Sequence, residues 1–237
     1  MGLRVLVTRP EPDAAATAAR LRAAGHEPLV DPLLRILPIA EARLSDGRFD
    51  AVALTSVNGA RALAVRPELD ALCGLPLHAV GRRTAAAAPA AFGQVHVAGG
   101  DGEKLAFALR AALPRGSRLL HVAGEDRAID LAAALAPDGI AVALFVIYRA
   151  SLTEALAVPT REALAQGRID AALHFSPRTA GALVAGARLA GLVPALARID
   201  HLCFSAGVAA PLRAAGAPAR VAAAPNEEAL LALLRDG

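Results

Sequence analysis

The sequence predicts an α/β protein of two similar lobes, each of them a parallel sheet covered by helices. The chain has 237 residues, of which 55% are hydrophobic, and this composition favours a buried globular core over disorder. Apolar strand segments alternate with Ala-rich helical segments, a pattern typical of parallel sheets with helices on both faces. The order of elements occurs twice, and "FDAVALTSVNGARAL" at 49–63 is similar to "IDAALHFSPRTAGAL" at 169–183.

The first half of the chain is predicted to alternate between strand and helix. Gly25 marks the end of the first helix, since helices often end with a glycine just past their last turn. Pro32 interrupts the long extended segment that follows. The expected strands are 3–7, 26–39, 49–56, 76–81 and 94–99, and the expected helices are 12–25, 57–66, 82–92 and 102–113.

The second half repeats this order. The strand at 117–124 corresponds to the first strand, and 125–150 supplies the helix, glycine turn and second strand. The alternation continues through 169–184, 199–216, 219–225 and 226–236. Between 49–63 and 169–183, six of fifteen positions are identical: Asp50/Asp170, Ala51/Ala171, Ser56/Ser176, Ala60/Ala180, Ala62/Ala182 and Leu63/Leu183. Three of these pairs are alanines in an Ala-rich chain, so the shared order of elements is the stronger indication of two lobes.

Charge and composition disfavour a nucleic-acid partner. The net charge is +3, from 25 basic and 22 acidic residues, and Lys104 is the single lysine. The excess of arginine is interpreted either as a bias of nucleotide composition or as a surface of planar guanidinium groups for carboxylates or phosphates. The arginines are scattered, and aromatic residues make up only 3% of a chain without tryptophan, so stacking on nucleic-acid bases is not expected.

The usual cofactor and metal motifs are also missing. No G-x-G-x-x-G follows the first strand and there is no P-loop, which disfavours nucleotide binding; "GGDG" at 99–102 is expected to be a turn. The histidines show no metal-ligand spacing, so no metal site is expected. They are His26, His78, His96, His121, His174 and His201.

Cysteine usage and the N-terminal segment indicate a cytoplasmic protein. Cys73 and Cys203 are far apart and neither belongs to a C-x-x-C pair, so both are expected to be free, buried thiols in a reducing compartment. The apolar run near the N-terminus ends at "TRP" and is too short for a signal peptide or a membrane span.

Polar residues follow the predicted strands at the point where ligands bind in parallel sheets. Helix N-termini with free N–H groups lie at the carboxyl edge of such sheets. Ser56 and Ser176 stand at this edge, where each is expected to cap a helix at about 1 kcal/mol, with capping alone as the alternative to ligand binding. Tyr148 is the only tyrosine and ends a strand, where packing alone is the competing interpretation.

Four pieces of the chain, in order, carry a family resemblance. They are "LRVLVTRPEPDAAATAARLRAAGHEPLVDPLLRI", "FDAVALTSVNGARAL", "LHAVGRRTAAA" and "VIYRA". The V-T-R-P, T-S-x-N, A-V-G-x-x-T and Y-R motifs form a specific set together. The chain resembles the uroporphyrinogen-III synthase family over its whole length.

The sequence also departs from the family pattern. "CFSAGVAA" stands where the family has I-G-x-x-T, so Ser205 takes the place corresponding to Gly81, and Val208 the place corresponding to Thr84. "HVAGEDR" replaces a Pro-containing turn, although Gly124 and Arg127 still fit. Ligand contacts from 205–208 are therefore the least secure part of the resemblance.

The resemblance implies a crossed topology. One lobe is expected to combine 1–34 with 153–237, and the other to comprise 39–146. The crossing segments are then 35–38 and 147–152. The sequence repeat and the folded lobes would be out of step.

The resemblance implies a lyase (a hydro-lyase) that closes linear hydroxymethylbilane to uroporphyrinogen III, with loss of water and inversion of the last pyrrole ring, and with neither metal nor cofactor. Tyr148 is the best candidate for the acid that protonates the departing hydroxyl. Arg9 and Arg178 could pair with substrate carboxylates, and their alternative is a solvated surface charge. The substrate-binding candidates are Arg9, Thr55, Ser56, Asn58, Gly81, Thr84, Gly124, Arg127, Ser176, Arg178, Thr179 and Ser205.

The expected partner is the small polycarboxylate substrate, with transient contact to hydroxymethylbilane synthase and no contact with membranes or nucleic acid. Two rival functions stay open at this point. A two-lobed small-molecule binding module would share the architecture, but such proteins are usually exported. A nucleotide-dependent α/β enzyme is disfavoured by the missing phosphate-binding loops.

Overall fold

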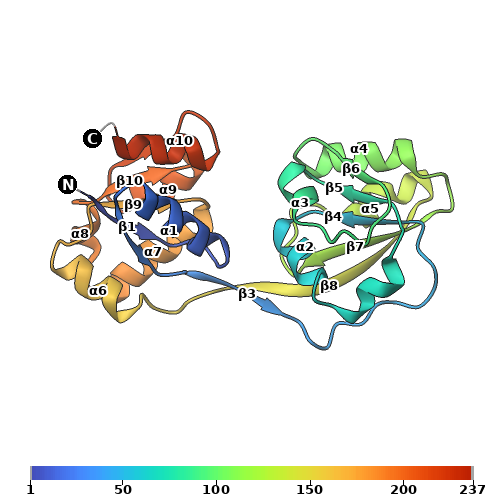
Figure 1. Ribbon diagram of the computed structural model, residues 1–237, viewed down its shortest axis with the longest axis horizontal. Coiled ribbons are helices and arrows are strands. Elements are labelled where there is room, and N and C mark those ends of the chain that lie inside the picture. Colours follow the sequence, from blue (N-terminus) through green and yellow to red (C-terminus); the bar gives the residue numbers. More distant parts are fainter. Residues whose placement is uncertain (1, 236–237) are drawn as a thin grey trace. The chain divides into compact units, whose positions relative to one another are not determined.

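The computed structural model describes residues 2–235, and the chain forms two compact units. One unit joins the first 35 residues to those from Ser151 onward, and the other is Ile36–Ala150. Each unit contains one sheet with helices on both faces (Figure 1). The predicted fold class, two mostly parallel sheets flanked by helices, is confirmed. The last predicted helix, 226–236, extends by its final residue outside the described residues.

The sheet of the first unit has the order β11-β10-β9-β1-β2, with every pair parallel. Its strands are β1 (Arg4–Val7), β2 (Glu27–Val30), β9 (Ala171–His174), β10 (Asp200–Cys203) and β11 (Ala219–Val221). Its helices are α1 (Asp13–Ala23), α6 (Val158–Ala165), α7 (Pro177–Leu189), α8 (Val193–Leu196), α9 (Ala206–Ala214), α10 (Glu227–Ala232) and the 3₁₀ helix η3 (Leu233–Arg235).

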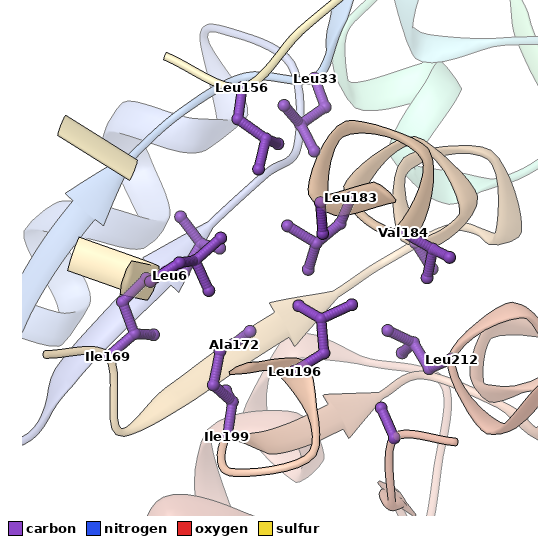
Figure 2. Packing of buried hydrophobic residues seen from close by; sticks show 14 of the residues in the cluster. Leu6, Leu33, Leu156, Ile169, Ala172, Leu183, Val184, Leu196, Ile199 and Leu212 are labelled. Carbon is purple, nitrogen blue, oxygen red and sulfur yellow. The ribbon is translucent and has the colours of Figure 1, made fainter. Parts of the chain in front are cut away.

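A hydrophobic cluster fills each face of this first sheet. On one face Leu6 and Ala172 of the strands pack against Leu183 of α7 and Leu196 of α8 (Figure 2). On the other face the strands pack against α1 and α10, with Leu21 fully buried. Burial of a leucine side chain contributes about 1.5–3 kcal/mol, so these two layers hold the sheet in place.

The sheet of the second unit has the order β3-β8-β7-β4-β5-β6. Its strands are β3 (Leu34–Pro38), β4 (Ala51–Leu54), β5 (Leu77–Ala79), β6 (Val95–Val97), β7 (Arg118–Gly124) and β8 (Ala141–Leu152). Its helices are α2 (Val57–Leu63), α3 (Arg82–Ala86), α4 (Gly102–Ala112), α5 (Leu131–Leu135) and the 3₁₀ helices η1 (Pro67–Leu72) and η2 (Ala136–Asp138). The chain passes between the units within β3 and within β8.

The two sheets place corresponding strands in the same order. Strands β2-β1-β9-β10-β11 of the first unit match β8-β7-β4-β5-β6 of the second. The repeated aspartate has the same role in both: Oδ2 of Asp170 accepts a hydrogen bond from the Arg4 backbone N–H at 2.6 Å, and Oδ2 of Asp50 accepts one from Arg118 at 2.7 Å. The repeat therefore preserves a strand-to-strand link as well as an order of elements.

Two predicted elements differ from the structure for local reasons. The helix predicted at 82–92 ends at Ala86, because Pro89 has no N–H and disfavours helical geometry in the residue before it. The extended segment 26–39 is two strands, separated around Pro32. Among the described residues no helix is long and apolar enough to cross a membrane.

Candidate active site

The turn between β4 and α2 holds two hydroxyl side chains in the second unit. Strand β4 ends at Leu54, Thr55 and Ser56 follow, and α2 begins at the next residue. Ser56 has extended backbone angles and its Oγ accepts a hydrogen bond from the Gly59 N–H at 2.9 Å. The predicted N-cap at Ser56 is confirmed.

Tyr148 reaches this turn from β8. Its Oη lies 2.8 Å from Oγ of Ser56. The register of β7 against β8 shifts at Gly124, which faces Tyr148 after Ala123 has faced Val146. Such a bulge places one extra residue in a strand and re-aims the side chains beyond it. The tyrosine is 8% exposed and belongs to a hydrophobic cluster, so it packs and also has a hydroxyl partner.

Gly124 provides the space for this ring. A Cβ atom at Gly124 would lie 2.6 Å from Cζ of Tyr148, closer than Cβ atoms are found to approach other atoms. The backbone N–H of Glu125 donates to the Tyr148 carbonyl at 3.0 Å. The family resemblance implies a substrate contact at Gly124. The structure adds a steric role, because a residue with a Cβ atom at this position would overlap the Tyr148 ring.

Thr55 pairs with a histidine from β7. Its Oγ1 lies 3.0 Å from Nε2 of His121, which is 2% exposed. Burial lowers the pKa of His121 to about 4; the nearby positive charge of Arg127 acts in the same direction and Asp130 opposes it. The imidazole is therefore neutral at pH 7. No sequence pattern singled out His121, because its partner is distant in the chain.

A cavity of about 540 Å³ opens beside this histidine. Its lining includes His121, Glu125, Arg127, Asp130 and Leu144. The exposed Arg127 donates through Nη1 to the carbonyls of Gly124, at 3.3 Å, and Glu125, at 3.0 Å. These hydrogen bonds of Arg127 stabilise the turn after β7, and the same residue lines the cavity.

The remaining candidates of the second unit lie on α2 and α3. Asn58 is the second residue of α2 and is half-buried. Gly81 is the N-cap of α3 and contributes backbone only, while Thr84 is buried within that helix.

In the first unit, Ser176 caps α7 as predicted. Its Oγ accepts from the Thr179 N–H at 3.2 Å and lies 3.0 Å from Oγ1 of Thr179. Arg178, in the first turn of α7, is exposed. Ser205 caps α9 at 3.4 Å and is exposed, while Val208 of the same turn is buried.

Arg9 is buried and engaged inside the first unit. Its Nη2 donates to Oδ2 of Asp13 at 2.8 Å, and Nη1 lies 3.5 Å from Oε2 of Glu227. Its guanidinium stands 4.0 Å from the centre of the Phe175 ring. The interpretation of Arg9 as a solvated surface charge is wrong, because its side chain is 9% exposed and links α1 to α10. A substrate carboxylate would compete with these internal carboxylates.

A buried histidine pair lies directly before the Ser176 turn. Nε2 of His174 is 2.9 Å from Nδ1 of His201, whose Nε2 is 3.0 Å from the Leu196 carbonyl. The carbonyl can only accept, so His201 carries its proton on Nε2 and His174 donates to it. Burial lowers the pKa of both imidazoles. Nδ1 of His174 is buried without a hydrogen-bond partner.

Comparison with protein families identifies the chain. The family model described as "Uroporphyrinogen-III synthase HemD" matches residues 15–232. The chain belongs to the uroporphyrinogen-III synthase family. A search of curated proteins finds no match.

Within residues 2–235, no group of three or more His, Cys, Asp and Glu side chains could hold a metal ion.

Two solved structures of this family share the fold. The uroporphyrinogen-III synthetase from Helicobacter pylori is 20% identical, with a TM-score of 0.67, over 100% of this chain and 99% of that one. A mutant uroporphyrinogen III synthase from Thermus thermophilus is 21% identical, with a TM-score of 0.53, over 99% of this chain and 97% of that one. At this identity the likeness concerns the fold.

Proposed function

We propose that the protein closes linear hydroxymethylbilane to uroporphyrinogen III, with loss of water and inversion of the last pyrrole ring. This is a lyase reaction of tetrapyrrole biosynthesis. Membership of the family supports the activity, and the observation that carries the mechanism is the 2.8 Å contact between Tyr148 Oη and Ser56 Oγ. A buried phenol takes a hydrogen-bond partner whatever its role, so what supports the mechanism is that this contact holds the Tyr148 hydroxyl beside the turn after β4.

The first chemical step is loss of the substrate hydroxyl. Tyr148 gives the phenolic proton to the departing oxygen, the carbon–oxygen bond breaks with its electron pair, and water leaves. The cation that remains on the first ring is attacked by the substituted carbon of the last ring. The resulting spiro intermediate fragments and recloses with that ring inverted. When the closing pyrrole carbon loses its proton, the phenolate recovers it, so the protons balance over the cycle.

The carboxylates of the substrate need donors along the sheet edges. We propose that the turns at Thr55, Ser56, Ser176 and Ser205 supply backbone N–H groups, with side-chain contributions from Arg127 and Arg178. Helix N-termini suit anions because their N–H groups have no partner within the helix. The other proposed contacts are Arg9, Asn58, Gly81, Thr84, Gly124 and Thr179.

We further propose the lobe division 1–34 with 153–237 and 39–146, crossed by 35–38 and 147–152. The reaction has no net oxidation, so an acid and an oriented substrate suffice, and neither cofactor nor metal is invoked. Both cysteines are free, which supports a cytoplasmic location; Cys203 is buried as expected, whereas Cys73 is exposed, so the expected burial of Cys73 is wrong. Transient contact with hydroxymethylbilane synthase would pass the unstable bilane directly to this enzyme.

A coupled assay tests the proposal. Porphobilinogen and its deaminase supply the bilane, which closes without enzyme to the uninverted isomer I. The protein should direct the product to isomer III. A binding module would leave isomer I as the product, which would reject the proposed function.

A further inference from the structure

Ser56 stands at a junction that links the cap of α2 to the phenol of Tyr148. We propose that Ser56 is a positioning residue of the reaction: its hydroxyl aims the phenolic proton and then stabilises the phenolate that remains. This inference rests on the proposed function. It gives Ser56 a role through Tyr148, which is separate from any contact of Ser56 with substrate.

The hydrogen-bond capacity of the serine restricts the arrangement. A serine hydroxyl has one proton to donate and two positions at which it can accept. The Gly59 N–H occupies one accepting position at 2.9 Å, and Tyr148 Oη lies 2.8 Å away. Either the phenol donates to the second accepting position, or the serine donates to the phenol oxygen. In the second arrangement the phenolic proton is available for the substrate.

The surroundings hold both hydroxyls in place. The Gly59 N–H fixes the serine Oγ, since the cap belongs to the first turn of α2. The tyrosine ring packs in the cluster that contains Val122 and Phe145, and a Cβ at Gly124 would overlap the ring. Hydroxyl pairs with restricted rotation are preorganised, so little reorganisation is needed when charge develops.

The contact strengthens during the chemical step. When the phenol transfers its proton to the departing hydroxyl oxygen, its own oxygen becomes anionic and can only accept. Ser56, which already donates in the productive arrangement, keeps this bond, and hydrogen bonds to a charged acceptor are stronger than those between neutral groups. The serine keeps its proton throughout, so the balance of the reaction is unchanged. The interaction is stronger in the transition state than in the ground state and lowers the barrier.

The corresponding serine of the other unit supports a specific role. Ser176 caps α7 with the same geometry, but its Oγ lies beside Thr179 of its own helix, at 3.0 Å. Capping therefore does not require a partner from another strand. The contact to Tyr148 is an addition in the second unit.

A double-mutant cycle on turnover tests this coupling. We expect Ser56→Ala to lower kcat about tenfold, the effect of one lost hydrogen bond, with a KM that changes less than about threefold. In the Tyr148→Phe background the same substitution should lower kcat by less than about threefold. Ser56→Thr retains a hydroxyl and should restore turnover to within about threefold of the native value. Equal losses from Ser56→Ala in both backgrounds would overturn the inference.

A matched control separates capping from positioning. Asp101 caps α4 in the same unit, where its Oδ1 accepts from the Lys104 N–H at 2.8 Å. Asp101→Ala should lower the melting temperature by about 2–4 °C, the effect of one lost cap, and Ser56→Ala should lower it by more because it also loses the bond to Tyr148. The control should leave kcat unchanged. A matching loss of kcat in the control would show that cap loss alone explains the serine effect.

The spectrum of the phenol gives a readout that a purely structural role would not move. Tyr148 is the only tyrosine and the chain has no tryptophan, so near-ultraviolet absorption and fluorescence report this side chain in the folded protein. Ser56→Ala should shift the tyrosine absorption band, Ser56→Thr should restore it, and Asp101→Ala should leave it in place. An unshifted band in Ser56→Ala would contradict the contact.

The outcomes distinguish this inference from the proposed function. A native protein that yields only isomer I rejects the function itself. A native protein that yields isomer III, combined with additive losses in the cycle, rejects the role of Ser56 alone. Unchanged turnover in Tyr148→Phe rejects the roles of Tyr148 and Ser56 together and leaves the proposed function standing.

Discussion

The turns that follow β4 and β9 use the same backbone device with different side-chain partners. In both, a serine with extended backbone angles caps a helix and accepts from the N–H three residues later. After β4 the preceding residue is Thr55, which meets a buried histidine, and the serine meets a phenol. After β9 the preceding residue is Phe175, which packs edge-on against Phe204 with ring centres 4.8 Å apart.

The difference separates what the repeat preserves from what it varies. The cap and the aspartate link between strands are structural, and both units keep them. In the second unit the hydroxyls of the turn meet side chains from other strands, whereas in the first unit the Ser176 hydroxyl meets Thr179 of its own helix. The first unit has instead the buried pair of His174 and His201 and the engaged Arg9. We infer that the proton chemistry of the proposed reaction belongs to the turn after β4.

The largest expected effect is that of Tyr148→Phe. The phenylalanine keeps the ring packing but removes the proton, so kcat should fall about a hundredfold, the usual contribution of a general acid. The product of the residual enzymatic reaction should still be isomer III, because ring inversion depends on how the enzyme holds the substrate. Stability should change by no more than about 1.5 kcal/mol, one hydrogen bond. Unchanged turnover would return Tyr148 to a packing role.

The next largest effect is expected for Gly124→Ala, because this substitution displaces the Tyr148 ring without removing its hydroxyl. The new methyl group would lie 2.6 Å from the ring, so the ring or the strand must move. We expect a destabilisation of about 1–3 kcal/mol and a loss of turnover of about tenfold or more.

Gly181→Ala is the matched control for this steric effect. Gly181 lies in α7, and its Cβ would have no neighbour within 4 Å. Alanine is the better helix former by about 1 kcal/mol, so the control should keep or raise stability, with turnover unchanged. If both alanine variants behave alike, crowding at Gly124 is not the cause.

Acid should weaken the fold through the buried histidines. Burial lowers the pKa of His174 and His201, and it lowers those of His78 and His121 to about 4. Below the unfolded value of about 6.5 the unfolded chain binds more protons than the native one, so stability present at neutral pH is lost as pH falls toward 4. Each such histidine contributes a slope of up to about 1.4 kcal/mol per pH unit.

Urea denaturation at several pH values measures this slope. Replacement of the pair in His174→Gln/His201→Gln removes two of these groups and should flatten the dependence between pH 6.5 and 4. A native protein whose stability is constant over this range would contradict the assignment of neutral buried imidazoles.

The smallest expected effects come from the two caps. Ser176→Ala and Ser56→Ala should each lower the free energy of unfolding by about 1 kcal/mol through the lost cap, and Ser56→Ala should lower it by up to about 1.5 kcal/mol more because it also loses the bond to Tyr148 Oη. Chemical denaturation of the two variants measures this directly. A smaller loss for Ser56→Ala than for Ser176→Ala would contradict the bond to the phenol.

The sequence predicted the elements better than the contacts. Alternating strands and helices and the serine caps follow from local patterns, because periodicity and cap residues act over a few positions. The prediction that Tyr148 ends a strand is wrong, because β8 continues past it to Leu152 and into the other unit. The helix predicted at 82–92 is longer than α3, because the alanines of this segment favour a helix while Pro89 prevents it from continuing. Pairings between distant strands leave no local signal. The contact of Thr55 with His121, the histidine pair and the burial of Arg9 therefore emerged only from the fold.

The role of Gly124 shows the same limit. A glycine in a strand can indicate a bulge or a close approach, but its sequence context does not reveal which side chain comes near. The register shift opposite Tyr148 identifies the neighbour. The resemblance selected both residues for separate roles, and the structure joins them.

Analysis of the uroporphyrinogen isomer tests the central claim most directly. Native protein is added to porphobilinogen and its deaminase, and the isomers are separated after oxidation to porphyrins; Tyr148→Phe is assayed beside it. We expect isomer III from the native protein, and a slower reaction with isomer I accumulating beside residual isomer III from the variant. Isomer I as the sole product of the native protein, at concentrations well above those of the deaminase, would contradict the account.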